Sequence, residues 1–402
     1  MQPYVGGKVL PMPLPILVDG VLGGMASARV RVVHDEIERA RAIVRGDPIL
    51  TVTSTELQQA LEESIDSVER RLSDAGPLTS NAATQVRGLL EECLTVAGGI
   101  LLRVKGTEAD AFAIADQLIR EISSAARRSW IALTVPGEEE RTSYSTGVIT
   151  LRFPGPDIWM LPIAAHELGH VVARDLEVTP TDGGPKYNPL TETFYSGRSI
   201  PRQREELWCD FFATYVLGPA YPWALLADLP SADRPPNEEF EDPVTSLATH
   251  PSTQIRLYAT LKTLECMNAA TGPYDAPYAL AIDRLTSICN PQVSVNSGKV
   301  IRLLIGQFWN VVTGYLGMCR FSVPMSARWL SEQLASGQPI SADPRLRVLD
   351  VVAAAWNARV DSWIRGADTT EHLEGRALDV CRRLVPSPAT TERQEKPGGI
   401  HV

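Results

Sequence analysis

The stretch that decides the fold is "AAHELGHVVA" at Ala164–Ala173, in which two histidines flank a glutamate. His166 and His170 are four residues apart, so a helix presents both imidazoles on one face, one turn apart. Two imidazoles at this spacing can bind one Zn²⁺ at about 2.0–2.1 Å each. Glu167 lies about 100° further round the helix, where it can reach a metal-bound water without binding the metal. The pentad therefore predicts a metal site, and the alternative is a buried helix with two hydrogen-bonded histidines.

A catalytic zinc site needs a third protein ligand and an open position for water. The extended pattern HExxHxxGxxH is excluded, because Ala173 and Leu176 stand at its last two positions. A GTxxD ligand is not visible in the following "TDGGPKYN". The remaining pattern places a glutamate on a second helix, with an aspartate four residues later. "EELWCD" supplies both, as Glu206 and Asp210.

In this interpretation Glu206 is the third metal ligand and Asp210 accepts the free ring N–H of His166. A carboxylate in that position fixes the tautomer of the histidine and makes it a better ligand. The alternative is a solvated acidic helix face, which is what most Glu/Asp pairs form. Glu192 and Glu205 are the fallback ligands.

Three segments together resemble a known family. "HELGH", then Glu-x-x-x-Asp ending at Asp210, then "THPSTQIRL" at Thr249–Leu257 are similar to the zinc metallopeptidases of the CaaX-prenyl endopeptidase and heat-shock-associated group. These enzymes are gluzincins, and their motifs run in this order. The resemblance covers about Ile158–Leu257, a quarter of the chain. It implies a zincin-like core and a Zn²⁺ cofactor.

The chain departs from that family at two points. Trp208 stands where the family usually has a second glutamate in its ExEAD motif. The best candidate for a membrane span, Leu303–Cys319, is shorter than the roughly 20 residues a span needs, and it contains Gln307 and Asn310. We therefore expect a divergent, soluble relative without a membrane span, and no prenylated substrate.

The family resemblance also gives His250 a role as hydrogen-bond donor to the developing oxyanion. Amide hydrolysis passes through a negatively charged intermediate that a fixed N–H stabilises. The alternative for His250 is a histidine that merely starts a helix before Pro251. Tyr187, Tyr195 and Arg256 are weaker candidates for the same task. The remaining histidines are expected at the surface: His34, His372 and His401.

The hydrophobic pattern predicts a mainly α protein, with a zincin-like core, one short strand or small sheet, and helical regions on both sides. Four amphipathic segments between Ala28 and Leu133 indicate an N-terminal helical bundle. "GVITLRFPG" is the only convincing strand, and we expect it to be an edge strand to which an extended peptide adds. The expected divisions are an extension (1–27), the bundle (28–134), the catalytic core (135–265), a C-terminal helical region (266–384) and a disordered tail (385–402).

Composition limits the classes of partner. The net charge of −10 and the pI near 5.2 argue against binding to nucleic acid. Six scattered cysteines without a CxxC pair indicate reduced thiols, so we expect a cytoplasmic protein without a signal peptide. Oligomeric state is left open.

These observations favour a zinc metallopeptidase acting on peptides or proteins, an endopeptidase rather than an exopeptidase. Glu167 would be the general base that activates the metal-bound water. The alternative is a helical interaction or regulatory protein with a structural or inactive zinc site. A glutamate placed as a base speaks against that alternative, because a structural site has no use for one.

Overall fold

A computed structural model gives the arrangement of the chain, which divides into two compact units, Met1–Ala97 and Gly98–Val402. The structure describes residues 42, 62, 66, 95, 96, 98–100, 102, 103, 109–130, 132–143, 147–152, 157–176, 188, 190, 202–228, 250–270, 278–316, 320, 321, 325–340, 343, 345–367 and 369–385. The first three segments expected in the N-terminal bundle lie mostly outside these residues. The fourth is helix α5 (Ala109–Ala126), which belongs to the second unit.

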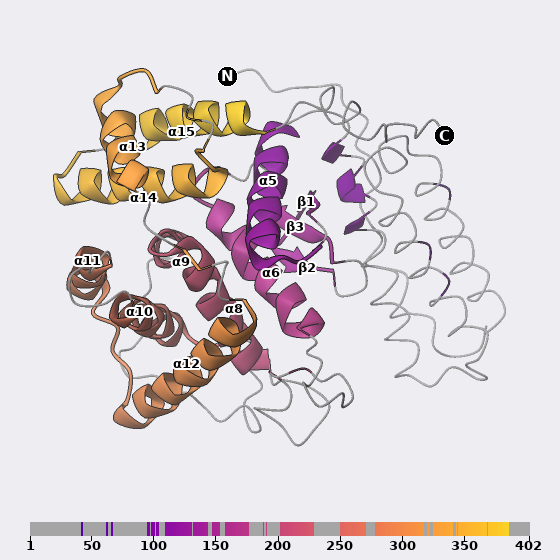
Figure 1. Cartoon of the computed structure of the whole chain (residues 1–402), viewed down its shortest axis with the longest axis vertical. Coiled ribbons are helices and arrows are strands. Elements are labelled where there is room, and N and C mark those ends of the chain that lie inside the picture. Colours follow the sequence, from indigo (N-terminus) through magenta and orange to yellow (C-terminus); the bar gives the residue numbers. More distant parts are fainter. Residues whose placement is uncertain are drawn as a thin grey trace, which may run out of the picture. The chain divides into compact units, whose positions relative to one another are not determined.

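The described part of the second unit is mainly helical with one small sheet, as the hydrophobic pattern predicts (Figure 1). The helices that follow α5 are α6 (Leu161–Asp175), α8 (Arg202–Leu217), α9 (Ala220–Asp228), α10 (Thr253–Ala269), α11 (Ala279–Cys289), α12 (Val295–Tyr315), α13 (Met325–Ser336), α14 (Val348–Ile364) and α15 (Thr370–Leu384). Within the described part of the chain, none of the helices combines the length and the apolar character that a membrane span requires.

Three short strands form the sheet in the order β1-β3-β2: β1 (Thr134–Gly137), β2 (Arg141–Thr142) and β3 (Ile149–Arg152). β3 pairs in parallel with β1 and antiparallel with β2. The expectation that this strand lies at an edge was therefore wrong, whereas the small sheet agrees with the expectation of one short strand or a small sheet. β1 and β2 are too short to show the alternation of apolar and polar residues that reveals a strand in a sequence.

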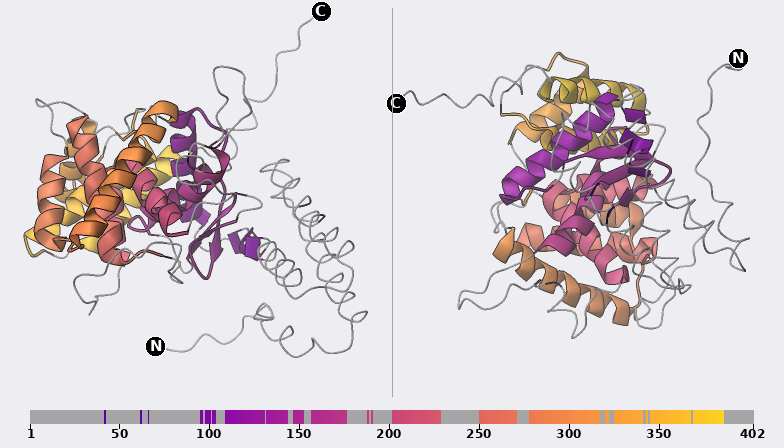
Figure 2. Two further views of the ribbon diagram at one scale, coloured as in Figure 1. Left: turned by 90° about the horizontal axis from the view of Figure 1, so that it is seen from below. Right: turned by 90° about the vertical axis from the view of Figure 1, so that its right-hand side faces the viewer.

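Helices α6 and α8 lie in the middle of the second unit, between the α13–α15 group and the α10–α12 group (Figures 1 and 2). α6 packs against α8, α9, α5 and strands β2 and β3, and α8 also packs against α10. Both helices are therefore buried nearly all round. Most of their residues are inaccessible to solvent, including the acidic and imidazole side chains.

Gly169 allows α6 and α8 to approach closely. A Cβ at this position would lie 2.8 Å from Cα of Cys209 and 3.1 Å from its Sγ, closer than real Cβ contacts allow. Trp208 fixes the same contact, because its indole N–H donates to the carbonyl of Gly169 at 3.0 Å. Trp208 thus joins the two helices that carry the histidines and the glutamates.

Candidate metal centre

Helix α6 places both histidines of the HELGH pentad in the protein interior. Pro162 lies in the first turn, where its missing N–H costs no helical hydrogen bond. Ala164, Ala165 and Gly169 let neighbouring elements cover the helix. The imidazoles of His166 and His170 are accordingly buried, and their rings lie 5.4 Å apart between centroids. Two buried imidazoles this close need polar partners, and α8 and α9 supply them.

Glu206 on α8 faces both imidazoles. Its Oε2 lies 3.2 Å from Nε2 of His166, and its Oε1 lies 3.6 Å from Nε2 of His170. Donors bonded to one tetrahedral zinc at the usual bond lengths lie roughly 3.3 Å apart. The two distances from Glu206 are close to that spacing, and the three side chains come from the two motifs that the sequence singled out.

The other ring nitrogens of the two histidines are held by two further acids. Nδ1 of His166 lies 3.1 Å from Oδ1 of Asp210, and Nδ1 of His170 lies 2.9 Å from Oε1 of Glu205. When a metal ion binds Nε2, a carboxylate at Nδ1 keeps the remaining ring proton on that nitrogen. Both rings thus present Nε2 toward Glu206. Asp210 lies beside Nδ1 of His166, the partner that the sequence suggested for it. Glu205, a fallback metal ligand in the sequence, instead contacts Nδ1 of His170.

A buried network surrounds Asp210. Arg256 of α10 donates to both of its carboxylate oxygens, from Nε at 2.9 Å and from a terminal nitrogen at 2.7 Å. The hydroxyl of Tyr221 on α9 donates to Asp210, so its oxygen can accept the Nδ1–H of His166 at 2.9 Å. Four helices therefore meet at this carboxylate. Arg256, a weaker candidate for the oxyanion, is instead committed to Asp210.

The acids control the protonation of the histidines. Burial alone would lower the pKa of His166, but hydrogen bonds to Asp210 and Glu206 outweigh it and raise the pKa to about 9. Burial is likewise outweighed for His170, whose pKa is raised mainly by the hydrogen bond to Glu205. The pKa of Glu206 is lowered because the hydrogen bond and charge of His166 overcome the effect of burial. Without metal, the acids of α8 therefore favour the protonated form of both imidazoles.

Glu167 points to a different partner from the two histidines. The hydroxyl of Thr142, on strand β2, lies 2.9 Å from Oε2 of Glu167 and 2.7 Å from its backbone carbonyl. Both residues are buried. β2 therefore fixes the glutamate of the pentad from the side of the sheet.

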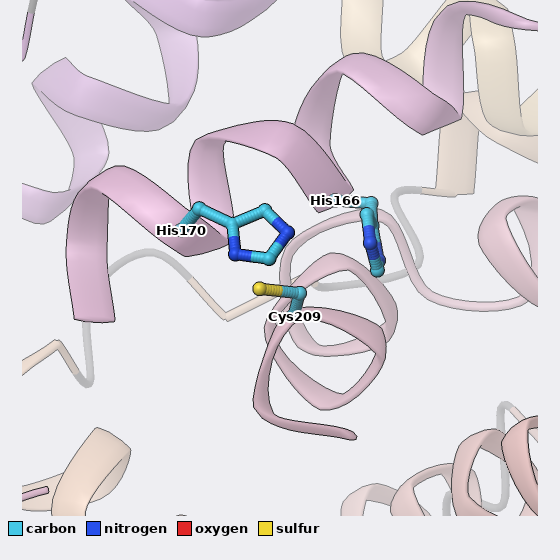
Figure 3. A group of neighbouring side chains, drawn as sticks. All are labelled: His166, His170 and Cys209. Carbon is cyan, nitrogen blue, oxygen red and sulfur yellow. The ribbon is translucent and has the colours of Figure 1, made fainter. Parts of the chain in front are cut away.

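Cys209 lies one turn beyond Glu206 on α8, on the same side as the histidines (Figure 3). Its Sγ and one ring nitrogen from each of His166 and His170 all lie within 4.8 Å of one another. These three buried side chains form a second combination that could hold a metal ion. Burial, followed by the charges of the neighbouring acids, raises the pKa of the Cys209 thiol well above its ordinary value.

His250 is also close to the acids. Its Nε2 lies 3.3 Å from Oε1 of Glu206, and 62% of its side chain is exposed. The sequence-derived candidates Glu192, Tyr187 and Tyr195 lie outside the described residues. His372 is exposed, as expected.

Sequence reasoning missed Thr142, Cys209 and Tyr221. Thr142 and Tyr221 lie 25 and 55 positions from their partners in the pentad, so no local spacing reveals them. Cys209 could have been found, because it directly precedes Asp210 and shares a helix face with Glu206. Comparison with known protein families, curated proteins and solved structures finds no match to this chain.

Proposed function

We propose that this protein is a zinc-dependent peptidase whose metal is held by His166, His170 and Glu206. The observation that carries the proposal is the convergence of two Nε2 atoms on one carboxylate, at 3.2 and 3.6 Å, while both Nδ1 atoms are held by other acids. Two imidazoles and a carboxylate are a usual donor set for catalytic zinc. The order of motifs along the chain supports a zincin-like core.

The chemistry of the proposed site follows from the side chains beside the donors. Zinc bound there would supply a water of lowered pKa and a Lewis acid for the scissile carbonyl. The Glu167 carboxylate would be the base that accepts a proton from such a water and returns it to the leaving amine. Thr142 orients Glu167 through its hydroxyl, 2.9 Å from Oε2. His250, whose Nε2 lies 3.3 Å from Oε1 of Glu206, is the side chain that we propose as donor to the oxyanion.

We further propose that an extended substrate peptide adds to β2. This strand lies at one end of the sheet order and carries Thr142, the partner of Glu167. Main-chain hydrogen bonds to a strand edge hold the interior of a peptide and need neither terminus. An endopeptidase is therefore preferred to an exopeptidase.

A second candidate is a helical regulatory protein with a structural or inactive zinc site. The observation that favours it is the buried thiol of Cys209, since structural zinc sites often combine cysteine and histidine. A structural site gives no reason for Glu167 to be held by Thr142, and the peptidase is preferred for that reason.

The substitution Glu167→Gln tests the peptidase proposal. It keeps the shape of the side chain and removes the base, so peptide cleavage should fall by roughly 10²–10⁴-fold while zinc content stays unchanged. Cleavage of a library of unstructured peptides by the full chain, followed by mass spectrometry, is the measurement. Glu371→Gln, at an exposed position of α15, is the matched control. Equal cleavage by the Glu167→Gln variant and the parent protein would refute the proposal.

A further inference from the structure

Cys209 has the surroundings of a metal ligand rather than those of a core thiol. Its side chain is fully buried, and it forms no disulfide. Its Sγ lies within 4.8 Å of a ring nitrogen of both His166 and His170. Figure 3 shows both imidazoles of α6 facing the turn of α8 that carries this thiol. An inert core thiol would be expected among apolar side chains, with no reason to face two imidazoles.

The packing leaves space for the sulfur at this point. Gly169 has no side chain, and a Cβ there would lie only 3.1 Å from Sγ of Cys209. Sulfur and nitrogen bonded to one tetrahedral zinc lie roughly 3.5 Å apart, so a thiol within 4.8 Å of both imidazoles is near enough to share an ion with them after a small movement. Rotation of the cysteine side chain supplies a movement of this size without a change in the backbone.

We propose that Cys209 is a sulfur ligand of the ion held by His166, His170 and Glu206, and that it competes with water for the position that hydrolysis needs. This inference rests on the proposed peptidase function and adds its regulation, because a sulfur-bound ion holds no nucleophilic water. The donor set becomes two nitrogens, one oxygen and one sulfur from two neighbouring helices.

When Cys209 binds the ion, its sulfur replaces the water ligand. The S–H bond of Cys209 breaks, a bond from sulfur to the metal forms, the metal-bound water leaves, and the proton passes to solvent. No group is oxidised or reduced. Burial and the neighbouring acids raise the pKa of the Cys209 thiol. A bound dication lowers it, because its charge stabilises the thiolate. A sulfur ligand also selects zinc or cobalt over magnesium or calcium, which prefer oxygen ligands.

Cobalt substitution tests the inference in the full-length protein. Co²⁺ replaces zinc in tetrahedral sites and reports a thiolate ligand through an intense sulfur-to-cobalt charge-transfer band in the near ultraviolet. We expect this band in the parent protein and its loss in both Cys209→Ser and Cys209→Ala, with cobalt content and visible d–d bands retained. Peptide cleavage by these variants should rise severalfold. Cys381→Ser, at a buried cysteine of α15, should leave the spectrum unchanged.

The possible failures are distinguishable. A parent protein that binds one cobalt without a charge-transfer band, or a band that survives in Cys209→Ala, would overturn the sulfur ligand and leave the peptidase proposal standing. A parent protein that binds no cobalt, or one whose cobalt content is unaffected by His166→Ala, would overturn both. The serine variant preserves side-chain size, so a folding defect confined to the alanine variant does not decide the result.

Discussion

Arg256 of α10 and Asp210 of α8 form a two-point ion pair beneath the candidate metal centre. The carboxylate is fully buried and the guanidinium is mostly so. Removing one partner of such a pair leaves an uncompensated buried charge, which costs about 3–5 kcal/mol. We therefore expect Arg256→Met and Asp210→Asn each to lower the free energy of unfolding by about that amount. In the double variant the loss should be clearly smaller than the sum.

Urea denaturation of the metal-free protein measures these differences. The exposed pair between Arg382 and Asp379 on α15 is the control, because an exposed ion pair contributes at most about 1 kcal/mol. Additive losses in the Arg256 and Asp210 variants would show that the two side chains do not interact in the folded protein.

Much of the candidate site could be predicted because its parts are local patterns. The i, i+4 spacing of His166 and His170 and the Glu206 to Asp210 spacing each fit on one face of one helix. Helical spacing is a strong signal in a sequence, so a helix was expected at each of these motifs, and α6 and α8 are those helices.

The contacts that complete the site could not be read from spacing. Thr142 reaches Glu167 from a two-residue strand, which is too short to leave a periodic pattern. Which acid contacts Nδ1 of His170 depends on the rotation of α8 about its own axis, and in this structure it is Glu205. That rotation is set by the contact between Gly169 and Cys209 and by the Trp208 hydrogen bond, both tertiary features.

The close approach of α6 and α8 gives a prediction about Gly169. In Gly169→Ala the added methyl group meets backbone at 2.8 Å, so the helices must separate and the histidines must move away from Glu206. We expect a loss of about 1–3 kcal/mol in the free energy of unfolding and weaker zinc binding. Thermal unfolding and zinc titration measure the two effects.

Gly306 provides the matched control. It lies within α12, and an added Cβ there meets nothing within 4 Å. Because alanine is the better helix former, Gly306→Ala should stabilise the protein by about 0.5–1 kcal/mol. If both variants behaved alike, the effect at Gly169 would reflect helix propensity and not the helix contact.

The protonation of His166 predicts a pH dependence for the metal-free protein. Its pKa rises from 6.5 to about 9 on folding, so its stabilising contribution is complete below pH 6.5 and is lost as the pH rises through about 9. The free energy of unfolding should fall by on the order of 3 kcal/mol across this pH range. Urea denaturation in the presence of a chelator should show this decline, and His166→Ala should flatten it. An unchanged slope in that variant would assign the decline to other groups.

The convergence of His166, His170 and Glu206 on one ion is tested most directly by zinc content at a fixed, buffered concentration of free zinc. We expect one zinc per chain in the full-length protein, as measured by elemental analysis. Glu206→Gln should lose affinity by more than the roughly 10–100-fold that loss of a ligand's hydrogen-bond partner costs. Glu371→Gln should retain one zinc. Full zinc content in Glu206→Gln under the same conditions, or no zinc in the parent protein, would contradict the proposed metal centre.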